Sequence, residues 1–153
     1  MERKWDYEIA RAGKDRRNWE IWKGEAIRRW AEGKALPYYG ILDGAIICAA
    51  PALLSRDAVQ NAYGLVDDKT VYLSAFRTIE GCQGRGYFSE LFRFLLNDLK
   101  RRGYTAATLG VEPQEIKNKA IYLHYGFTEQ IKTAKETYPD GTEITVEYYR
   151  KRL

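Results

Sequence analysis

The sequence is poor in the side chains that bind transition metals. Its 153 residues contain two cysteines, Cys48 and Cys82, and a single histidine, His124. A zinc site of the usual kind takes more cysteine and histidine ligands than this chain contains. The composition therefore excludes such a site, and we expect a protein that needs no metal.

Long hydrophobic runs are also missing. None approaches the ~20 apolar residues that a membrane-spanning helix needs. Residues 1–6, Met-Glu-Arg-Lys-Trp-Asp, are charged and lack the apolar core of a secretory signal. We therefore expect a cytoplasmic protein without a membrane partner.

No basic tract stands out in the charge pattern. The 25 Lys and Arg residues are spread among 21 Asp and Glu residues, which gives a net charge of only +4. Proteins that bind nucleic acid usually gather basic residues into one patch. This balance permits a small anionic ligand and gives no sign of a nucleic-acid partner.

The composition that is present is that of a globular domain. Hydrophobic residues make up 45% and charged residues 30%, which separates the chain from disordered sequences. The length suits one domain with a full hydrophobic core, and there is no internal repeat, low-complexity stretch or linker. We expect residues 1–153 to form a single domain.

The amino-terminal part predicts a strand and then a helix. Bulky side chains alternate with acids over residues 5–9, which is typical of a short strand, here ending near Gly13. Between residues 15 and 33 the bulky side chains recur at helical spacing: Trp19, Trp22, Ala26, Ile27 and Trp30. A basic, tryptophan-rich helix can lie on a membrane or pack on a sheet, and its interspersed acids favour packing.

The middle of the chain predicts a hairpin and a parallel crossover. Apolar runs at 36–42 and 45–50 flank Asp43-Gly44, the strongest hairpin signal in the sequence. A strand over 70–76 is followed by a helix from Phe88, with apolar residues at Leu91, Phe92, Leu95, Leu96 and Leu99. A short buried strand at 106–111 completes a strand-helix-strand unit, whose strands should be parallel.

The last third predicts a helix and a second hairpin. Residues 115–125 have the helical apolar set Ile116, Ala120, Ile121 and Leu123, and Gly126 ends the helix. Strands at 128–133 and 142–149 flank a turn at 138–141. The whole pattern predicts an α/β (α+β) fold with a mixed central sheet flanked by helices.

A glycine-rich turn, Gln83-Gly84-Arg85-Gly86-Tyr87-Phe88, joins the central strand to its helix. Glycines leave the backbone open, the first N–H groups of a helix have no partner within it, and Arg85 adds a positive charge. Together they indicate a phosphate site at the carboxyl end of a central strand. The alternative is a tight loop with a solvated arginine. A Walker loop would end in Gly-Lys-Ser/Thr and a Rossmann turn needs a third glycine, so both are disfavoured.

Two motifs, in their order and separation, make the sequence resemble the GCN5-related N-acetyltransferase (GNAT) superfamily. The acetyl-CoA loop of that family, Gln/Arg-x-x-Gly-x-Gly/Ala, is similar to residues 83–88, with Phe88 in place of the small last residue. The later family pattern Tyr-x-x-x-Gly-Phe is met by Tyr122, Gly126 and Phe127. The resemblance covers about residues 71–127.

The resemblance implies transfer of an acetyl group from acetyl-CoA to an amine, on a small molecule or a peptide, by an enzyme that can form homodimers. It assigns the pantetheine arm to backbone groups of Phe76, Arg77 and Thr78, and the pyrophosphate to the N–H groups of Gln83, Gly84, Arg85, Gly86, Tyr87 and Phe88. The family also has an asparagine where Glu115 stands here. Asn118, one turn later, is the candidate for that role.

The implied reaction needs a neutral amine, donors for the carbonyl oxygen and a proton for the departing thiolate. Tyr122 matches the proton donor of the family, and its alternative role is to pack against the core. Glu112 and Glu80 lie near the predicted site as candidate general bases, and each can equally be a solvated loop acid. We interpret His124 as a surface residue and Cys82 as a plain loop cysteine.

Two further function classes stay open in the sequence. A non-catalytic module that binds acyl-CoA or a nucleotide would have the same fold, but would release no thiol in the presence of an amine. An interaction domain without a small ligand would bind no CoA.

Overall fold

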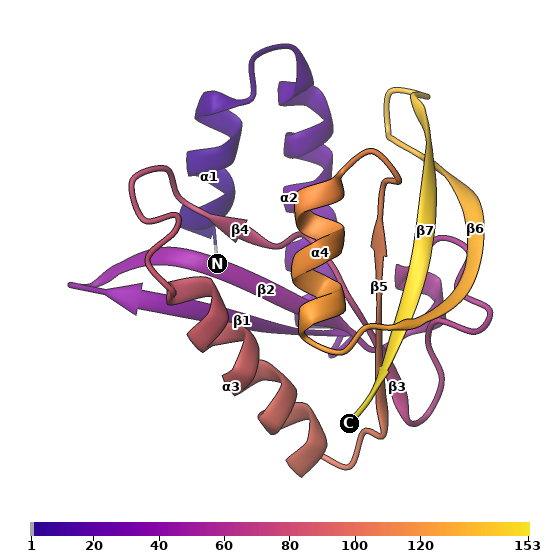
Figure 1. Cartoon of the computed structure of the whole chain (residues 1–153). Coiled ribbons are helices and arrows are strands. Elements are labelled where there is room, and N and C mark those ends of the chain that lie inside the picture. The colour runs from indigo at the N-terminus through magenta and orange to yellow at the C-terminus, as the bar shows by residue number, and fades with distance from the viewer. Residues whose placement is uncertain (1) are drawn as a thin grey trace.

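The computed structural model describes residues 2–153 (Figure 1). Two helices open the chain, α1 (Glu2–Arg11) and α2 (Arg16–Ala31), joined by the short 3-10 turn η1 (Gly13–Asp15). The other helices are α3 (Tyr87–Arg101), α4 (Ile116–His124) and the 3-10 turn η2 (Arg56–Ala58). The strands are β1 (Ala35–Leu42), β2 (Ala45–Leu53), β3 (Thr70–Leu73), β4 (Arg77–Thr78), β5 (Ala106–Val111), β6 (Glu129–Thr137) and β7 (Glu143–Arg152).

The strands form one mixed sheet in the order β1-β2-β3-β5-β7-β6, with β4 paired to β2. β3 and β5 are parallel, and the other pairs are antiparallel. The predicted hairpins are β1–β2 and β6–β7, and the predicted crossover is β3-α3-β5. The fold class expected from the sequence is confirmed.

The sheet opens beyond the end of β3. The register of β3 with β5 runs from Thr70↔Ala106 to Leu73↔Leu109. The chain then turns at Ala75, whose φ of 51° is rare for a residue with a side chain. It continues as β4, which pairs with Cys48 and Ala49 of β2. Because β5 runs on to Val111 while β4 follows β2, the two strands separate and leave room for a ligand between them.

The predicted apolar stripe of α3 packs on one face of the sheet. Leu91, Phe92, Leu95 and Leu99 are all buried against β1, β2 and β5. Full burial of one such side chain contributes ~1.5–3 kcal/mol. This stripe therefore holds the amino end of α3, and the loop before it, in a fixed place at the edge of the opening.

The opposite face of the sheet is covered by the segment from 55 to 68 and by the amino-terminal helices. α1 packs on α2, α2 contacts β1, and α1 contacts β2. Asn18 of α2 holds the β6–β7 turn through two hydrogen bonds. Its side chain donates to Asp140 Oδ2 at 3.1 Å and accepts from the Asp140 N–H at 3.1 Å. The tryptophan-rich helix thus packs on the sheet and its hairpin. No helix in the described part of the chain is long and apolar enough to cross a bilayer.

The strand predicted for residues 5–9 is wrong, because these residues lie in α1. Lys4, Trp5 and Glu8 share the inner side of this helix, with Lys4 and Trp5 buried and Glu8 half-buried. That spacing is helical, whereas the alternation of bulky and acidic residues covered too few positions to tell the two periods apart. The predicted strand 70–76 also ends early, at Leu73.

The apolar set predicted for α4 is wrong as well. Ile116, Ile121 and Leu123 are exposed, with Ile116 at 75% of its full accessible surface. The helix instead packs through Tyr122 and Tyr125, which lie against the core beside α3. Aromatic side chains bury more area than aliphatic ones, so the two tyrosines set the rotation of the helix.

Candidate active site

A cleft of about 1180 Å³ lies where the sheet opens, between the 72–78 segment, the glycine-rich loop, the end of β5 and α4. It brings together most of the site residues predicted from the sequence: Phe76, Arg77, Thr78, Gln83, Gly84, Gly86, Tyr87, Phe88, Glu112, Asn118 and Tyr122. Glu80 and Arg85 are not part of its lining. The Glu80 carboxylate is exposed and accepts a hydrogen bond from Arg11 outside the cleft.

The backbone of the glycine-rich loop faces open space. Gly84 and Gly86 have φ angles of 72° and 83°, which residues with a side chain rarely adopt. A Cβ added at either glycine would meet no atom within 4 Å. Gly86 is also the N-cap of α3, and no side chain caps that helix end. The exposed N–H groups and the free volume before them fit the pyrophosphate of a CoA molecule.

Phe88, which departs from the family pattern, belongs to an aromatic cluster. Its ring stacks on Phe92 with the centroids 5.4 Å apart, and it meets Phe76 at 5.5 Å. The large side chain therefore packs against the start of α3 and the segment before the loop. The space before Gly84 and Gly86 stays open despite it.

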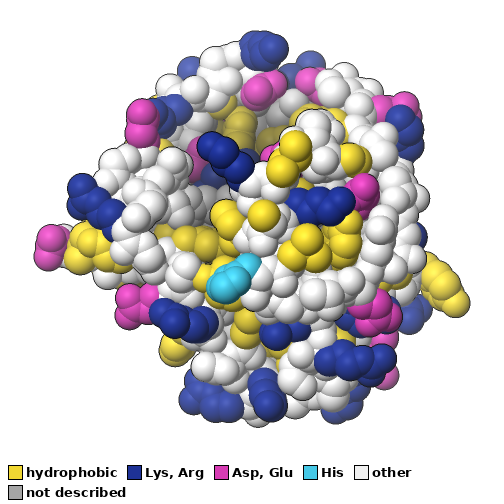
Figure 2. Space-filling model, in the orientation of Figure 1, with side chains coloured by type: hydrophobic (Ala, Val, Ile, Leu, Met, Phe, Trp, Pro, Cys, Tyr) yellow, Lys and Arg dark blue, Asp and Glu magenta, His cyan; other side chains and the backbone are white. Residues whose placement is uncertain are grey.

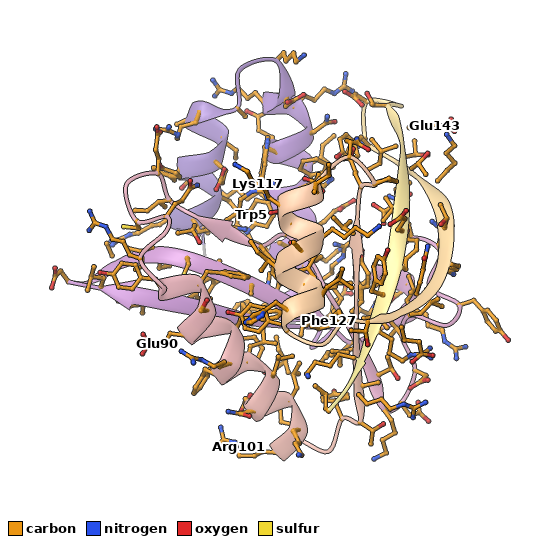
Figure 3. All side chains as sticks on the ribbon, viewed as in Figure 1. Trp5, Glu90, Arg101, Lys117, Phe127 and Glu143 are labelled. Atoms are coloured by element: carbon orange, nitrogen blue, oxygen red, sulfur yellow. The ribbon has the colours of Figure 1, made fainter. Side chains whose placement is uncertain are left out.

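The motif Tyr-x-x-x-Gly-Phe forms the carboxyl end of α4. The Gly126 N–H donates to the Leu123 carbonyl at 3.0 Å, and the Phe127 N–H donates to the Tyr122 carbonyl at 3.1 Å. This is the Schellman arrangement, and it needs the left-handed conformation of Gly126 (φ 95°). Phe127 is fully buried and so anchors this end of the helix; Figure 3 labels it beside the carboxyl end of α4. The motif thus fixes where Tyr122 stands.

Tyr122 is half-buried in the cleft wall, with its ring centroid 5.5 Å from that of Phe76. Burial raises its pKa to about 12, with a smaller push from Glu115 and a small opposing effect of Arg77. The phenol therefore keeps its proton at neutral pH. It both packs and faces the cleft, so the two roles considered for it are compatible.

The remaining candidates from the sequence make few contacts in the structure. The Glu112 carboxylate lies at the cleft and accepts a hydrogen bond from the Gln114 side chain. The Asn118 amide donates to Glu115 at 3.3 Å. His124 is exposed, and Cys82 is a free, half-buried thiol in the loop. No group of three or more potential metal-ligating side chains occurs among residues 2–153.

A second cavity, of about 300 Å³, lies under the amino-terminal helices. Its walls include the aromatic side chains of Trp5, Trp19, Trp22, Tyr39 and Tyr138. The cavity and the cleft adjoin each other, because both are lined by the same six residues: Tyr72, Ser74, Ala75, Arg77, Glu136 and Tyr138. Figure 2 shows the surface hollowed between α4 and the amino-terminal helices.

Glu136 of β6 stands at the junction of the two spaces and was missed in the sequence. Its carboxylate accepts a hydrogen bond from the Tyr148 hydroxyl at 2.7 Å. Burial raises its pKa, the Tyr148 hydrogen bond lowers it, and Glu112 adds a small upward push. The signal that identifies such a residue is an acid at an inward position of an amphipathic strand. The limits of β6 were drawn too short to include it.

The sequence profile of the Acetyltransferase (GNAT) family matches residues 4–127. This match covers most of the chain, so the protein belongs to the GNAT acetyltransferase family. It is an acetyl-CoA-dependent N-acetyltransferase, and the resemblance found in the sequence is confirmed. No curated protein sequence matches the chain.

Solved structures with the same fold include three bacterial acetyltransferases. Ribosomal-protein-S18-alanine N-acetyltransferase from Escherichia coli is 18% identical, with a TM-score of 0.62 over 82% of this chain and 76% of that one. Ribosomal-protein-alanine N-acetyltransferase from Brucella melitensis is 18% identical, with a TM-score of 0.65 over 88% and 78%. The acetyltransferase yncA from Salmonella typhimurium, solved with its cofactor acetyl-CoA, is 16% identical, with a TM-score of 0.62 over 88% and 73%. At these identities the likeness concerns the fold.

Proposed function

We propose that acetyl-CoA lies along the cleft and that the amine acceptor enters from the cavity under the amino-terminal helices. The two spaces adjoin at Ser74, Ala75 and Glu136, which line both, and this supports the arrangement. It lets an amine approach the thioester from the side opposite to the glycine-rich loop.

The cofactor would be held mainly by backbone groups. The N–H groups of Gly86, Tyr87 and Phe88 would bind the pyrophosphate, because the uncapped end of α3 favours negative charge. Arg85 acts as an auxiliary cation beside the cleft. Backbone groups of Phe76, Arg77 and Thr78 would pair with the pantetheine arm, since β4 is paired with β2 on its other side.

Acetyl-CoA supplies an acetyl group activated as a thioester. In the proposed reaction the amine nitrogen bonds to the carbonyl carbon and the carbon–sulfur bond breaks. Glu136 takes the proton that the amine loses, and Tyr122 gives its phenolic proton to the sulfur. The products are an N-acetylated amine and free CoA; Glu136 then gives its proton to solvent, and solvent restores the proton of Tyr122. Glu112 is the alternative base, because its carboxylate also lines the cleft.

The observation that carries this proposal is the protonated, half-buried Tyr122 hydroxyl in the cleft wall. Tyr122→Phe removes the transferable proton and keeps the ring packed on Phe76. We expect the acetyl-transfer step to slow by ~10²–10⁴-fold, with CoA affinity and stability nearly unchanged. Single-turnover transfer at saturating acetyl-CoA measures that step even where product release limits steady-state turnover.

Tyr125→Phe is the matched control. Tyr125 is the C-cap of the same helix, and its ring centroid lies 4.8 Å from that of Phe92 in the same cluster. This variant should transfer acetyl at the wild-type rate. A wild-type single-turnover rate in Tyr122→Phe would remove Tyr122 from the mechanism. CoA binding without thiol release for any amine would favour the non-catalytic binding module.

A further inference from the structure

The acceptor cavity contains a buried cation that has no anionic partner. Lys4 lies on the inner side of α1, is only 9% exposed and lines the cavity. Its Nζ lies 3.9 Å from the centroid of the Trp5 ring. Within residues 2–153 no carboxylate lies within ion-pair distance of it. An ammonium that is largely buried and has no ion-pair partner is costly, so this position favours the arrival of an anion.

The charges around Lys4 do not neutralise it. Arg77 is close enough to repel it, and burial together with this repulsion lowers the pKa of Lys4 to about 8. Glu8 attracts Lys4 and so raises its pKa by the smallest of the three effects, and its carboxylate lies 3.9 Å from Arg77 Nε. Glu25 across the cavity is held by Arg29 at 3.4 Å. The wall formed by Lys4 and Arg77 therefore keeps an excess of positive charge.

The same opening also contains an acid. Arg77 and Glu136 both line the junction between cavity and cleft. The Arg77 guanidinium packs over Trp19 at 4.8 Å, and this contact holds it toward the cavity. A cation pair on one side of the opening and a carboxylate on another match the carboxylate and the amine of a single small molecule.

We propose that the acceptor is a free α-amino acid with an apolar or aromatic side chain. Its carboxylate binds between Lys4 and Arg77, and its amine lies toward Glu136 and the thioester. Its side chain packs against Trp19, Trp22 and Tyr138. This assignment rests on the proposed function of the cleft and names the substrate class of that site.

The size and charge of the cavity disfavour the other acceptors. A volume of about 300 Å³ suits one side chain, and is at the small end of ligand sites. A peptide amino terminus would place a neutral amide beside Lys4 and leave the ammonium unpaired. A polyamine would bring a second cation toward Lys4 and Arg77, which would repel it.

The first test compares acceptors that differ only in the carboxylate. L-Phenylalanine, L-leucine and L-tryptophan are each tested beside their amides and their decarboxylated amines, with thiol release as the readout. For at least one side chain we expect the free acid to exceed the other two forms in kcat/KM by ~10–100-fold, the size expected for a charge-assisted contact. Equal or better turnover of the amides would overturn the inference and leave the acetyltransferase function intact.

Substitution of Lys4 directly tests the proposed carboxylate-binding site between Lys4 and Arg77. Lys4→Met removes the charge and keeps an apolar stem of similar length, so the fold should persist, as a thermal melt would verify. The preference for the free acid should fall to near unity, through KM rather than kcat. Lys4→Arg should retain the preference. Lys14→Met, at an exposed lysine of η1, is the control and should behave as wild type. An undiminished preference in Lys4→Met would contradict the proposal.

A binding measurement separates this inference from the proposed function. Calorimetry with the CoA-bound protein compares N-acetyl-L-phenylalanine, N-acetyl-L-leucine and N-acetyl-L-tryptophan with their amides. Tighter binding of the acids that is lost in Lys4→Met supports the proposed carboxylate-binding site. This holds even if no acceptor releases thiol; that result would contradict the proposed function but not the carboxylate-binding site. If the acids bind no more tightly than the amides, the proposed carboxylate-binding site between Lys4 and Arg77 is wrong.

Discussion

At the scale of single residues, the loop depends on backbone conformation more than on charge. Gly86 has a left-handed φ of 83° and is the N-cap of α3, whereas Arg85 does not line the cleft. Gly86→Val would place a branched side chain before the N–H groups and strain the turn. We expect it to weaken CoA binding more than Arg85→Ala does, measured by calorimetry.

Gly81 offers a control for strain alone. It has a φ of 87° in the same loop, has no neighbour within 4 Å of an added Cβ, and lies outside the cleft lining. Gly81→Val should therefore strain the loop while leaving CoA affinity close to wild type. A CoA affinity indifferent to Gly86→Val would contradict the placement of the pyrophosphate.

Glu136 and Glu112 are distinguished by their surroundings. Burial raises the pKa of Glu136, so below that pKa the carboxyl is protonated and cannot accept a proton from the amine. We expect the rate of acetyl transfer to fall on the acid side in wild type. Glu136→Gln should lose ~10²–10⁴-fold in kcat/KM and the acid limb with it. Glu112→Gln should keep the wild-type kcat/KM and its decline at low pH. If Glu112→Gln lost both and Glu136→Gln kept them, Glu112 would be the base.

At the scale of elements, the end of α4 links stability to the site. Gly126→Ala forces a side chain into a φ of 95°, and its Cβ would lie 2.7 Å from Lys151 Nζ, a flexible atom that can move away. The backbone strain should lower the free energy of unfolding by ~1–2 kcal/mol, measured by urea denaturation. Activity should fall too, because the strain weakens the hydrogen bond from the Phe127 N–H to the Tyr122 carbonyl, which helps to position Tyr122.

Gly24→Ala is the opposite case within another helix. Gly24 lies inside α2, does not have a positive φ and has open space around an added Cβ. Alanine there should stabilise the protein by ~0.5–1 kcal/mol. If Gly126→Ala were neutral or stabilising in the same way, the left-handed end of α4 would not be required.

The elements with strong local signals were predictable from the sequence. The apolar stripe of α3 extends over several turns, and Asp43-Gly44 joins two long apolar runs, so local chemistry determined both. α1 was not, because the alternation at 5–9 spans too few positions. The helix α4 was predicted, but its buried face was not, since Tyr122 and Tyr125 gain more from burial than Ile116 and Ile121, and only the partner surface decides between them.

At the scale of the whole molecule, the site divides into a part that local sequence specifies and a part that it does not. The cleft is formed around the β3-α3-β5 crossover, so its loop and Tyr122 could be predicted from two motifs. The acceptor cavity combines α1, α2 and β2 with β6, which lies far from them in the chain. Lys4 and Glu136 line this cavity together only because of tertiary packing, and no sequence pattern indicates that they share a space.

The stability of the whole molecule should carry a pH signature of Lys4. Folding lowers the pKa of this lysine from 10.5 to about 8, so between these values the unfolded chain binds the extra proton. Stability rises with pH wherever the unfolded state binds more protons. Relative to Lys4→Met, the free energy of unfolding of wild type should therefore increase from pH 8 to pH 10.5, by ~3 kcal/mol at most.

Other groups titrate in the same range with the opposite sign, and the comparison cancels them. Burial raises the pKa of Cys48 and of Tyr38, Tyr72, Tyr122 and Tyr148, so their contributions are lost as pH rises. They are common to wild type and Lys4→Met, and urea denaturation of both proteins at pH 7.5, 8.5 and 9.5 isolates the lysine. A constant difference across these pH values would mean that Lys4 is solvated and keeps its ordinary pKa in the folded protein, and would remove the unpaired burial from which the carboxylate-binding site is inferred.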